Sequence, residues 1–392
     1  MEDRSLESMY GTIHRRIDGG IDRILSGSHW KLKALLAILA VSLFRAFPSY
    51  DALQTTFVET KWSNVQVKFD HPLADTSRIF PPGSHESNLT FRLTVPILAH
   101  ALHLHRTGML IFFAFAGVLL FYLALRVAYT VSTSKKVALF VCLATACAWP
   151  GVAAFHELRG GYYDALALCL LMAAFATSSA ALTGLFVFLA AWTDERALIA
   201  SSFLVLFCAC GGTGGTRRLF AGRPLAVVAA GAAYLGTRAY LAGTHSYFIG
   251  GSGIGLFVFS QQINVIPLAI WTGLGGSWIL VFLGLLTLFL QRRYLAAAGF
   301  CGALAGVMGA ALAVVDVTRS MAYCLPAVFV ALTVLSRSEP IKQLEKLTMI
   351  GAVICLVVPT YYLEGNAGSW WLYPLPVQIV RWLLPTATLH RF

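Results

Sequence analysis

Long apolar runs separated by short polar segments dominate this chain from about residue 34 onward. A membrane-spanning helix needs about 20 mostly apolar residues, and sometimes only about 17. The pattern therefore predicts an all-α polytopic membrane protein with about eleven transmembrane helices, several of the central ones short. The predicted spans cover residues 34–48, 108–130, 136–154, 162–177, 179–193, 196–210, 224–241, 264–290, 294–314, 318–336 and 348–363.

Three regions depart from this pattern of apolar runs. In residues 1–30, apolar side chains recur at roughly helical spacing among arginines and aspartates, which predicts a cytoplasmic amphipathic segment on the membrane surface, with a partner-binding segment as the alternative. Within 31–363, the expected transmembrane domain, the long loop 49–107 is external. It contains an apolar stretch, 91–104, that predicts an interfacial or re-entrant helix. Aromatic residues in 364–392 predict an external tail at the outer interface.

Composition and charge narrow the class of protein further. With 58% hydrophobic and 12% charged residues, the chain cannot bury its apolar surface in a water-soluble fold. The net charge of +11 follows the positive-inside rule, because the basic clusters fall on one side of the predicted topology. We therefore expect a cytoplasmic N-terminus, an external C-terminus and no nucleic-acid partner. The basic clusters are Arg15 and Arg16, Lys135 and Lys136, Arg217 and Arg218, Arg292 and Arg293, and Arg337 with Lys342.

Acidic residues between the first predicted span and residue 336 all fall on the non-cytoplasmic side of this topology. A charged side chain costs about 2.5–3.5 kcal/mol at the centre of a membrane helix. Three charged groups at helix ends on one face therefore predict a polar cavity that opens outward, although loop residues that pair locally would give the same pattern. The groups are His156, Arg159, Tyr163 and Asp164; Asp194, Glu195 and Arg196; and Asp316 with Arg319.

The long external loop supplies a fourth group and two isolated carboxylates. His85, Glu86 and Arg92 lie close together in the sequence and add to the candidate site. Asp51 and Asp75 are further candidates, although each alone is typical of a polar loop residue. A cavity lined by carboxylates and arginines suits glycosyl transfer from a polyprenyl-phosphate sugar.

Each residue type has a definite role in that chemistry. A carboxylate would act as general base on the acceptor hydroxyl, which in an inverting reaction attacks opposite the leaving group. Arginines would bind the departing phosphate as its negative charge develops. The catalytic candidates are Asp51, Asp75, Glu86, Asp164, Asp194, Glu195 and Asp316, and the substrate-binding candidates are His85, Arg92, His156, Arg159, Tyr163, Arg196 and Arg319.

With these features the chain resembles the GT-C superfamily of integral membrane glycosyltransferases. The resemblance rests on a cytoplasmic N-terminus, a first span followed by a long acidic external loop with an interfacial helix, and Thr193-Asp194-Glu195-Arg196 opening a later helix. It implies an enzyme that works with membrane lipid, a polyprenyl-phosphate sugar donor and a glycan, lipid or protein acceptor. In that superfamily the catalytic carboxylate commonly lies in the first external loop beside another acid. This loop has only separated acids, namely Asp51, Glu59, Asp70, Asp75 and Glu86.

Two other functions stay open from the sequence. A transporter or flippase for an anionic substrate would also use arginines in a cavity, but no internal repeat of the kind common in transporters is evident. A non-catalytic subunit of a membrane complex could share the architecture. The motifs predict no cofactor, and a divalent metal ion stays open as an alternative. We expect the bacterial inner membrane as the location.

Overall fold

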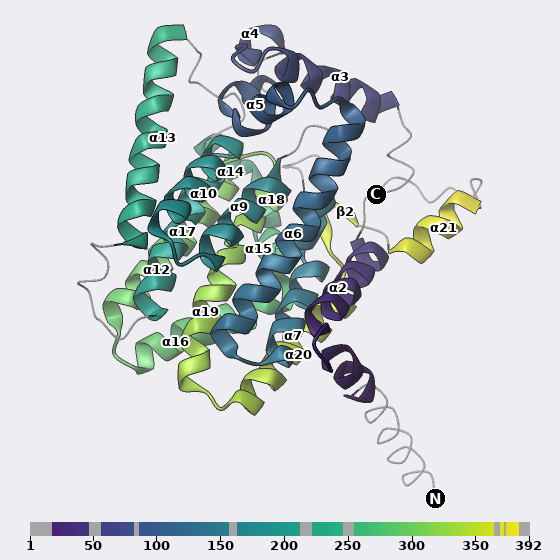
Figure 1. The fold of residues 1–392 in the computed structure, drawn as a ribbon, viewed down its shortest axis with the longest axis vertical. Helices are drawn as coiled ribbons and strands as arrows, with labels where there is room; N and C mark the ends of the chain where they lie inside the picture. Colours follow the sequence, from purple (N-terminus) through teal and green to yellow (C-terminus); the bar gives the residue numbers. More distant parts are fainter. Residues whose placement is uncertain are drawn as a thin grey trace, which may run out of the picture.

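The computed structural model describes residues 18–46, 56–81, 86–156, 163–211, 222–245, 255–363, 369–371 and 374–383. These residues are almost entirely helical, so the prediction of an all-α protein is confirmed (Figure 1). One short antiparallel pair of strands joins β1 (Tyr361–Leu363) to β2 (Ser369–Trp371), with Tyr362 opposite Trp370. The sequence pattern does not predict this hairpin.

Among the described residues, five helical stretches are long and apolar enough to cross a membrane. Helices α7 (Lys135–Cys147) and α8 (Trp149–His156) pass the same test together but are bent by 72° at their break, as in a broken span or a re-entrant loop. The five are α6 (Arg106–Ser132); α13 (Arg223–His245); α17 (Tyr294–Leu312); the run α14 (Leu256–Gln262), η5 (Ile263–Val265), α15 (Ile266–Leu274), η6 (Gly275–Ser277) and α16 (Trp278–Leu290); and the run α18 (Val317–Met321), η7 (Ala322–Cys324) and α19 (Leu325–Ser338).

The other predicted spans are shorter helices in the structure. The segment predicted at 348–363 differs most, since its helix starts earlier, at Ile341, and gives way to β1 before residue 363. Val358 has an extended backbone, which ends the helix. The shorter helices are α2 (Trp30–Ala46), α9 (Asp164–Ala176), α10 (Ala180–Thr193), α11 (Arg196–Ala200), α12 (Ser202–Gly211) and α20 (Ile341–Val357).

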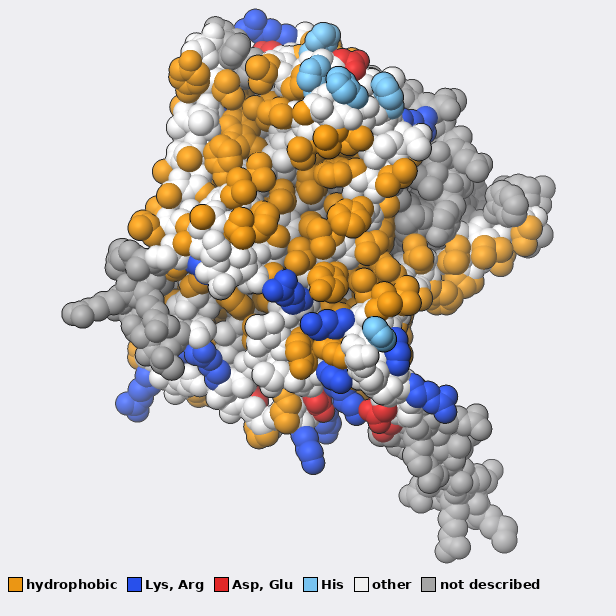
Figure 2. Space-filling model, in the orientation of Figure 1, with side chains coloured by type: hydrophobic (Ala, Val, Ile, Leu, Met, Phe, Trp, Pro, Cys, Tyr) orange, Lys and Arg blue, Asp and Glu red, His pale blue; other side chains and the backbone are white. Residues whose placement is uncertain are grey.

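The surface carries a broad apolar band. Figure 2 shows hydrophobic side chains across the middle of one face, lysines and arginines toward its lower end, and histidines at its upper end. Large apolar side chains such as Leu225, Val228 and Leu235 of α13 and Phe282 of α16 are exposed in this protein. An apolar belt between polar ends is consistent with an integral membrane protein.

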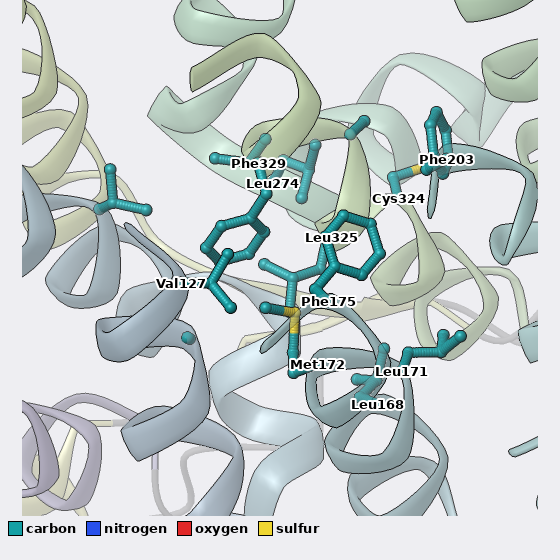
Figure 3. Packing of buried hydrophobic residues seen from close by; sticks show 14 of the residues in the cluster. Val127, Leu168, Leu171, Met172, Phe175, Phe203, Leu274, Cys324, Leu325 and Phe329 are labelled. Carbon is teal, nitrogen blue, oxygen red and sulfur yellow. The ribbon is translucent and has the colours of Figure 1, made fainter. Parts of the chain in front are cut away.

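Helix α19 forms the centre of the bundle, and its residues from Leu325 to Leu335 are buried. It packs against α16, α12 and α6. The Phe175 ring of α9 lies 6.3 Å from the Phe329 ring of α19, centroid to centroid (Figure 3). It also lies 4.9 Å from the Phe207 ring of α12. This close packing fixes α9 in the bundle and, with it, the charged residue at its first position.

The C-terminal hairpin closes the break between α7 and α8. Thr360 donates a hydrogen bond to the Cys147 carbonyl at 2.8 Å, and the Tyr362 ring stacks on Trp149 at 5.4 Å. The Leu363 amide donates to the Thr318 hydroxyl at 2.8 Å, which ties the same strand to α18. The strand therefore satisfies a backbone carbonyl left free at the break and joins two distant helices.

A small helical cap lies above the bundle in Figure 1. The Thr94 hydroxyl of its last helix donates to the Leu189 carbonyl of α10 at 2.8 Å and so fastens the cap to the bundle. The apolar stretch predicted at 91–104 forms an eight-residue helix here. At the C-terminal end, α21 (Leu375–Leu383) lies beside α2. The cap consists of α3 (Thr56–Asp70), α4 (Thr76–Ile79), η2 (Glu86–Phe91) and α5 (Thr94–Ala101).

Candidate functional site

A continuous series of ion pairs, in which carboxylates and arginines alternate, lies beneath the cap. We call it the ion-pair chain. Its members come from η2–α5, α9, the α10–α11 junction and α18, so residues far apart in sequence meet at helix ends. In order along the chain they are Asp316, Arg319, Asp164, Arg196, Asp194, Arg92 and Glu195.

The two carboxylates inside the chain are fully buried and saturated with donors. Asp164 accepts hydrogen bonds from Arg319 Nε at 2.7 Å, Arg196 Nη2 at 3.0 Å and the Tyr323 hydroxyl at 3.3 Å. Asp194 accepts from the Arg196 amide at 3.0 Å and from Arg196 Nη2 at 2.6 Å. Charge-assisted bonds of this kind fix a carboxylate in place. Because donors already occupy their oxygens, both aspartates are suited to building the site.

The carboxylates at the two ends of the chain are more accessible. The Glu195 side chain is 43% exposed, and its Oε1 lies 3.5 Å from Arg92 Nη2. The Asp316 side chain is 24% exposed, and its Oδ2 lies 2.6 Å from Arg319 Nη1. Asp316 Oδ1 is itself buried and accepts no hydrogen bond from the residues that the structure describes. The carboxylates at the ends of the ion-pair chain are thus more exposed than those in its middle, and Asp316 keeps an unused acceptor oxygen.

Arg92 keeps unused hydrogen-bond donors although its side chain is only 7% exposed. Its Nη2 lies 3.2 Å from Asp194 Oδ2, whereas its Nε and Nη1 find no acceptor in the described part of the chain. The hydroxyl of Tyr163 is also buried without a partner there. A buried donor left unpaired costs about 1–3 kcal/mol, and more when it is charged. An anionic ligand would supply the acceptors that Arg92 lacks.

The two residues before Arg92 are held in place. Lys68 Nζ of α3 donates to the Ala74 and Thr90 carbonyls at 2.8 Å and 3.0 Å. Burial lowers the pKa of the Lys68 ammonium to about 8, although the nearby Asp75 carboxylate opposes that shift. The Arg238 guanidinium of α13 lies 4.2 Å from the centroid of the Phe91 ring, a cation–π contact. These contacts fix the backbone that carries Arg92.

The ion-pair chain lies well below the cap-side ends of the neighbouring helices. The Tyr163 ring, next to Asp164, stacks on Phe113 of α6 with centroids 6.0 Å apart. Phe113 follows the first residue of α6 by seven positions, which is about 10 Å of helix. Trp192, close to Asp194, likewise contacts Tyr234 of α13, and this helix continues for about 16 Å to its end. The ion-pair chain is therefore recessed beneath the cap.

Three polar residues of the site escaped the analysis of the sequence. The Ser320 hydroxyl accepts from Arg196 Nη1 at 2.6 Å and donates to the Asp316 carbonyl at 2.8 Å, and the Tyr323 ring lies under the Arg196 guanidinium at 5.0 Å. Gln262 of α14 donates to the Val314 carbonyl at 2.7 Å and holds the turn before Asp316. Helical spacing was a usable signal for two of them, because Ser320 follows Asp316, and Tyr323 follows Arg319, by four positions.

The residues predicted from the sequence fall into three groups: some lie in the site, one lies in the cap, and the side chains of others are not described. Asp75 caps α4, accepts from Ser77 and Thr90, and pairs with Arg78 at 3.1 Å, so it belongs to the cap. The structure brings Asp164, Asp194, Glu195, Asp316, Arg92, Arg196 and Arg319 together and places Tyr163 next to them. Glu86 begins η2 and His156 ends α8, with side chains outside the described part. Asp51, His85 and Arg159 lie outside the described residues.

Neither a metal centre nor a known relative helps to define this site. Among the described residues, no three His, Cys, Asp or Glu side chains come together in a way that could hold a metal ion. Comparison of the chain with protein families, curated proteins and solved structures finds no match. The ion-pair chain is thus the feature of the described residues that points most directly to a function.

Proposed function

We propose that this protein is an inverting membrane glycosyltransferase that moves a sugar from a polyprenyl-phosphate donor to an acceptor at the non-cytoplasmic face. One observation carries the proposal. Arg92 is buried with two unpaired donors, and a carboxylate with a free oxygen, Asp316, lies at the opposite end of the same ion-pair chain. This arrangement offers a phosphate-binding group and a base on one rigid frame.

In this proposal the donor phosphate binds at Arg92. Hydrogen bonds from a guanidinium to phosphate oxygens are charge-assisted and stronger than bonds between neutral groups. Two donors of Arg92, Nε and Nη1, are unused by the described residues. Negative charge builds up on the phosphate as the glycosidic bond breaks, so these hydrogen bonds strengthen in the transition state. The Tyr163 hydroxyl offers a further donor nearby.

Asp316 is the general base of the proposed reaction. In an inverting displacement the acceptor hydroxyl attacks on the face opposite the leaving phosphate. Glu195 pairs with the same arginine that would bind the phosphate, whereas Asp316 is separated from Arg92 by the rest of the chain. Its free Oδ1 takes the hydroxyl proton as the new carbon–oxygen bond forms, and the lipid phosphate leaves with the electron pair of the broken bond.

The membrane setting of the proposal follows from the sequence. About eleven spans, a GT-C-like arrangement and a cytoplasmic N-terminus would put the cap and the ion-pair chain on the outer side of a bacterial inner membrane. Helices α3 to α5 occupy the long loop 49–107, as expected for a first external loop. The polyprenyl tail would lie in the bilayer beside the helices while its phosphate reaches the recess.

The test is turnover of the full chain purified into lipid nanodiscs. The protein is incubated with a panel of polyprenyl-phosphate sugars, with and without glycan, lipid and protein acceptors, and release of the lipid phosphate is followed. We expect release that depends on an acceptor and is lost in Asp316→Asn. The matched control is Asp70→Asn, since Asp70 is an exposed aspartate of the cap outside the ion-pair chain. Donor binding without release would indicate a transporter or an accessory subunit instead.

A further inference from the structure

An apolar cavity of about 110 Å³ lies between α2, α7 and α20, away from the ion-pair chain. None of its lining residues is charged, and none belongs to the ion-pair chain. Its α20 wall includes Val353 and Leu356, which are exposed on the molecular surface. Apolar cavities stay free of water, and one of ~150 Å³ accepts a benzene molecule. The lining residues are Val41, Phe140, Leu143, Cys147, Met349, Ala352, Val353 and Leu356.

A buried arginine marks the outer end of this cavity. Arg45 follows the lining residue Val41 by one helical turn, and its Nη2 donates to the carbonyl of Val358, just beyond the lining residue Leu356. Its Nε is buried and has no acceptor among the described residues. The guanidinium thus combines a cationic group with an unused donor next to an apolar cavity.

Arg45 lies in the outer part of the hydrocarbon layer, near the lipid headgroups. It lies fifteen positions after Trp30, the first residue of α2, which is about 22 Å along the helix. The hydrocarbon layer of a bilayer is about 30 Å thick. With Lys31 and Lys33 at the cytoplasmic end, Arg45 lies toward the outer leaflet, where its side chain can reach a phosphate.

We propose that this cavity binds a short segment of one acyl chain of an anionic phospholipid of the outer leaflet and that Arg45 binds its phosphate. The apolar wall accommodates the segment, which enters past Val353 and Leu356. The phosphate supplies the acceptor that Arg45 Nε lacks, and charge complementarity favours an anionic lipid over a zwitterionic one. This site is independent of the proposed catalytic reaction.

Native mass spectrometry of the detergent-purified full chain tests the proposal. The protein is mixed with equal amounts of phosphatidylglycerol and phosphatidylcholine of identical acyl chains. We expect phosphatidylglycerol to be retained about fivefold more than phosphatidylcholine, which is the ratio for about 1 kcal/mol from one arginine near a phosphate. A phosphatidylglycerol with a diazirine in one acyl chain should crosslink to the peptides that contain Phe140 to Cys147 and Met349 to Leu356.

Two variants separate the two parts of the site. Arg45→Gln should bring the retention ratio close to one, while Ala352→Phe, which fills the cavity and leaves Arg45 intact, should abolish crosslinking to those peptides. Val228→Phe on the exposed face of α13 is the matched control and should change neither readout. Equal retention of both lipids by the unmodified protein would overturn the proposal. So would an unchanged ratio in Arg45→Gln, or crosslinking that persists in Ala352→Phe.

Discussion

Ion pairs at the two ends of this bundle differ in what surrounds them. The end beneath the cap holds the ion-pair chain, whose inner members Asp164 and Asp194 have no exposed surface. The opposite end holds a pair between Lys136 and Asp22, 3.1 Å apart, whose side chains are 36% and 62% exposed. An exposed pair contributes about 0–1 kcal/mol, whereas removal of one partner from a buried pair costs about 3–5 kcal/mol. The same chemistry therefore gives a surface contact in one place and a rigid frame in the other.

The largest loss of stability is expected from removing Asp164, the central carboxylate of the ion-pair chain. Asp164→Ala leaves Arg196 and Arg319 buried without their shared carboxylate, so the free energy of unfolding should fall by about 3–5 kcal/mol. Thermal unfolding and the yield of monodisperse protein in detergent measure this loss. Asp22→Ala, in the exposed Lys136–Asp22 pair, is the matched control and should change the free energy of unfolding by at most about 1 kcal/mol. Equal behaviour of the two variants would remove the contrast between the two ends.

Neutralising Asp316, at one end of the ion-pair chain, should affect turnover rather than folding. Asp316→Asn keeps the size of the side chain but removes the base, so the rate of sugar transfer should fall by about 10²–10⁴-fold with little change in thermal stability. Turnover in nanodiscs and an unfolding curve are recorded on the same preparation. If Asp316→Asn turns over at the rate of Asp70→Asn, the base must be another group.

Substitution of Arg92 should weaken recognition of the polyprenyl-phosphate sugar. Arg92→Lys keeps the charge but loses the unused Nε and Nη1 donors. Hydrogen bonds to charged groups contribute about 1.5–3 kcal/mol, so kcat/KM for the sugar donor should fall by about 10–150-fold. Arg78→Lys, in the exposed arginine of the cap, is the control. The same loss in both variants would point to a general effect on the cap instead of phosphate binding.

The smallest effect expected is a pH dependence of the cap. The pKa of Lys68 is lowered by burial from 10.5 to about 8. Between these values the unfolded chain binds the proton and the folded chain does not, so the contribution of Lys68 to the free energy of unfolding rises with pH across this window. The unfolding midpoint should therefore rise between pH 7.5 and pH 9.5 by more in the unmodified protein than in Lys68→Met. Lys342→Met, in an exposed lysine, should keep the pH response of the unmodified protein.

The sequence was sufficient for the all-helical, apolar character of the fold but could not rank the candidate residues. The apolar runs predict the helices, because hydrophobic periodicity and length depend on local composition. Asp194 and Glu195 are neighbours in sequence, yet one is buried under two arginines and the other is 43% exposed. That difference arises from the approach of Arg92 and Arg196, which no local pattern encodes. The docking of β1 on α18 depends in the same way on residues distant in sequence.

The span of the ion-pair chain along the sequence also sets an order of events during synthesis. Arg319 follows its partner Asp164 by 155 residues. At about 5–20 residues per second, a ribosome needs about 10–30 s to supply the second partner after the first. Throughout that interval, Asp164 lacks one of the two guanidinium groups that bury it in the finished protein. The recessed site is therefore completed only late in translation, when α18 joins helices that have already been inserted.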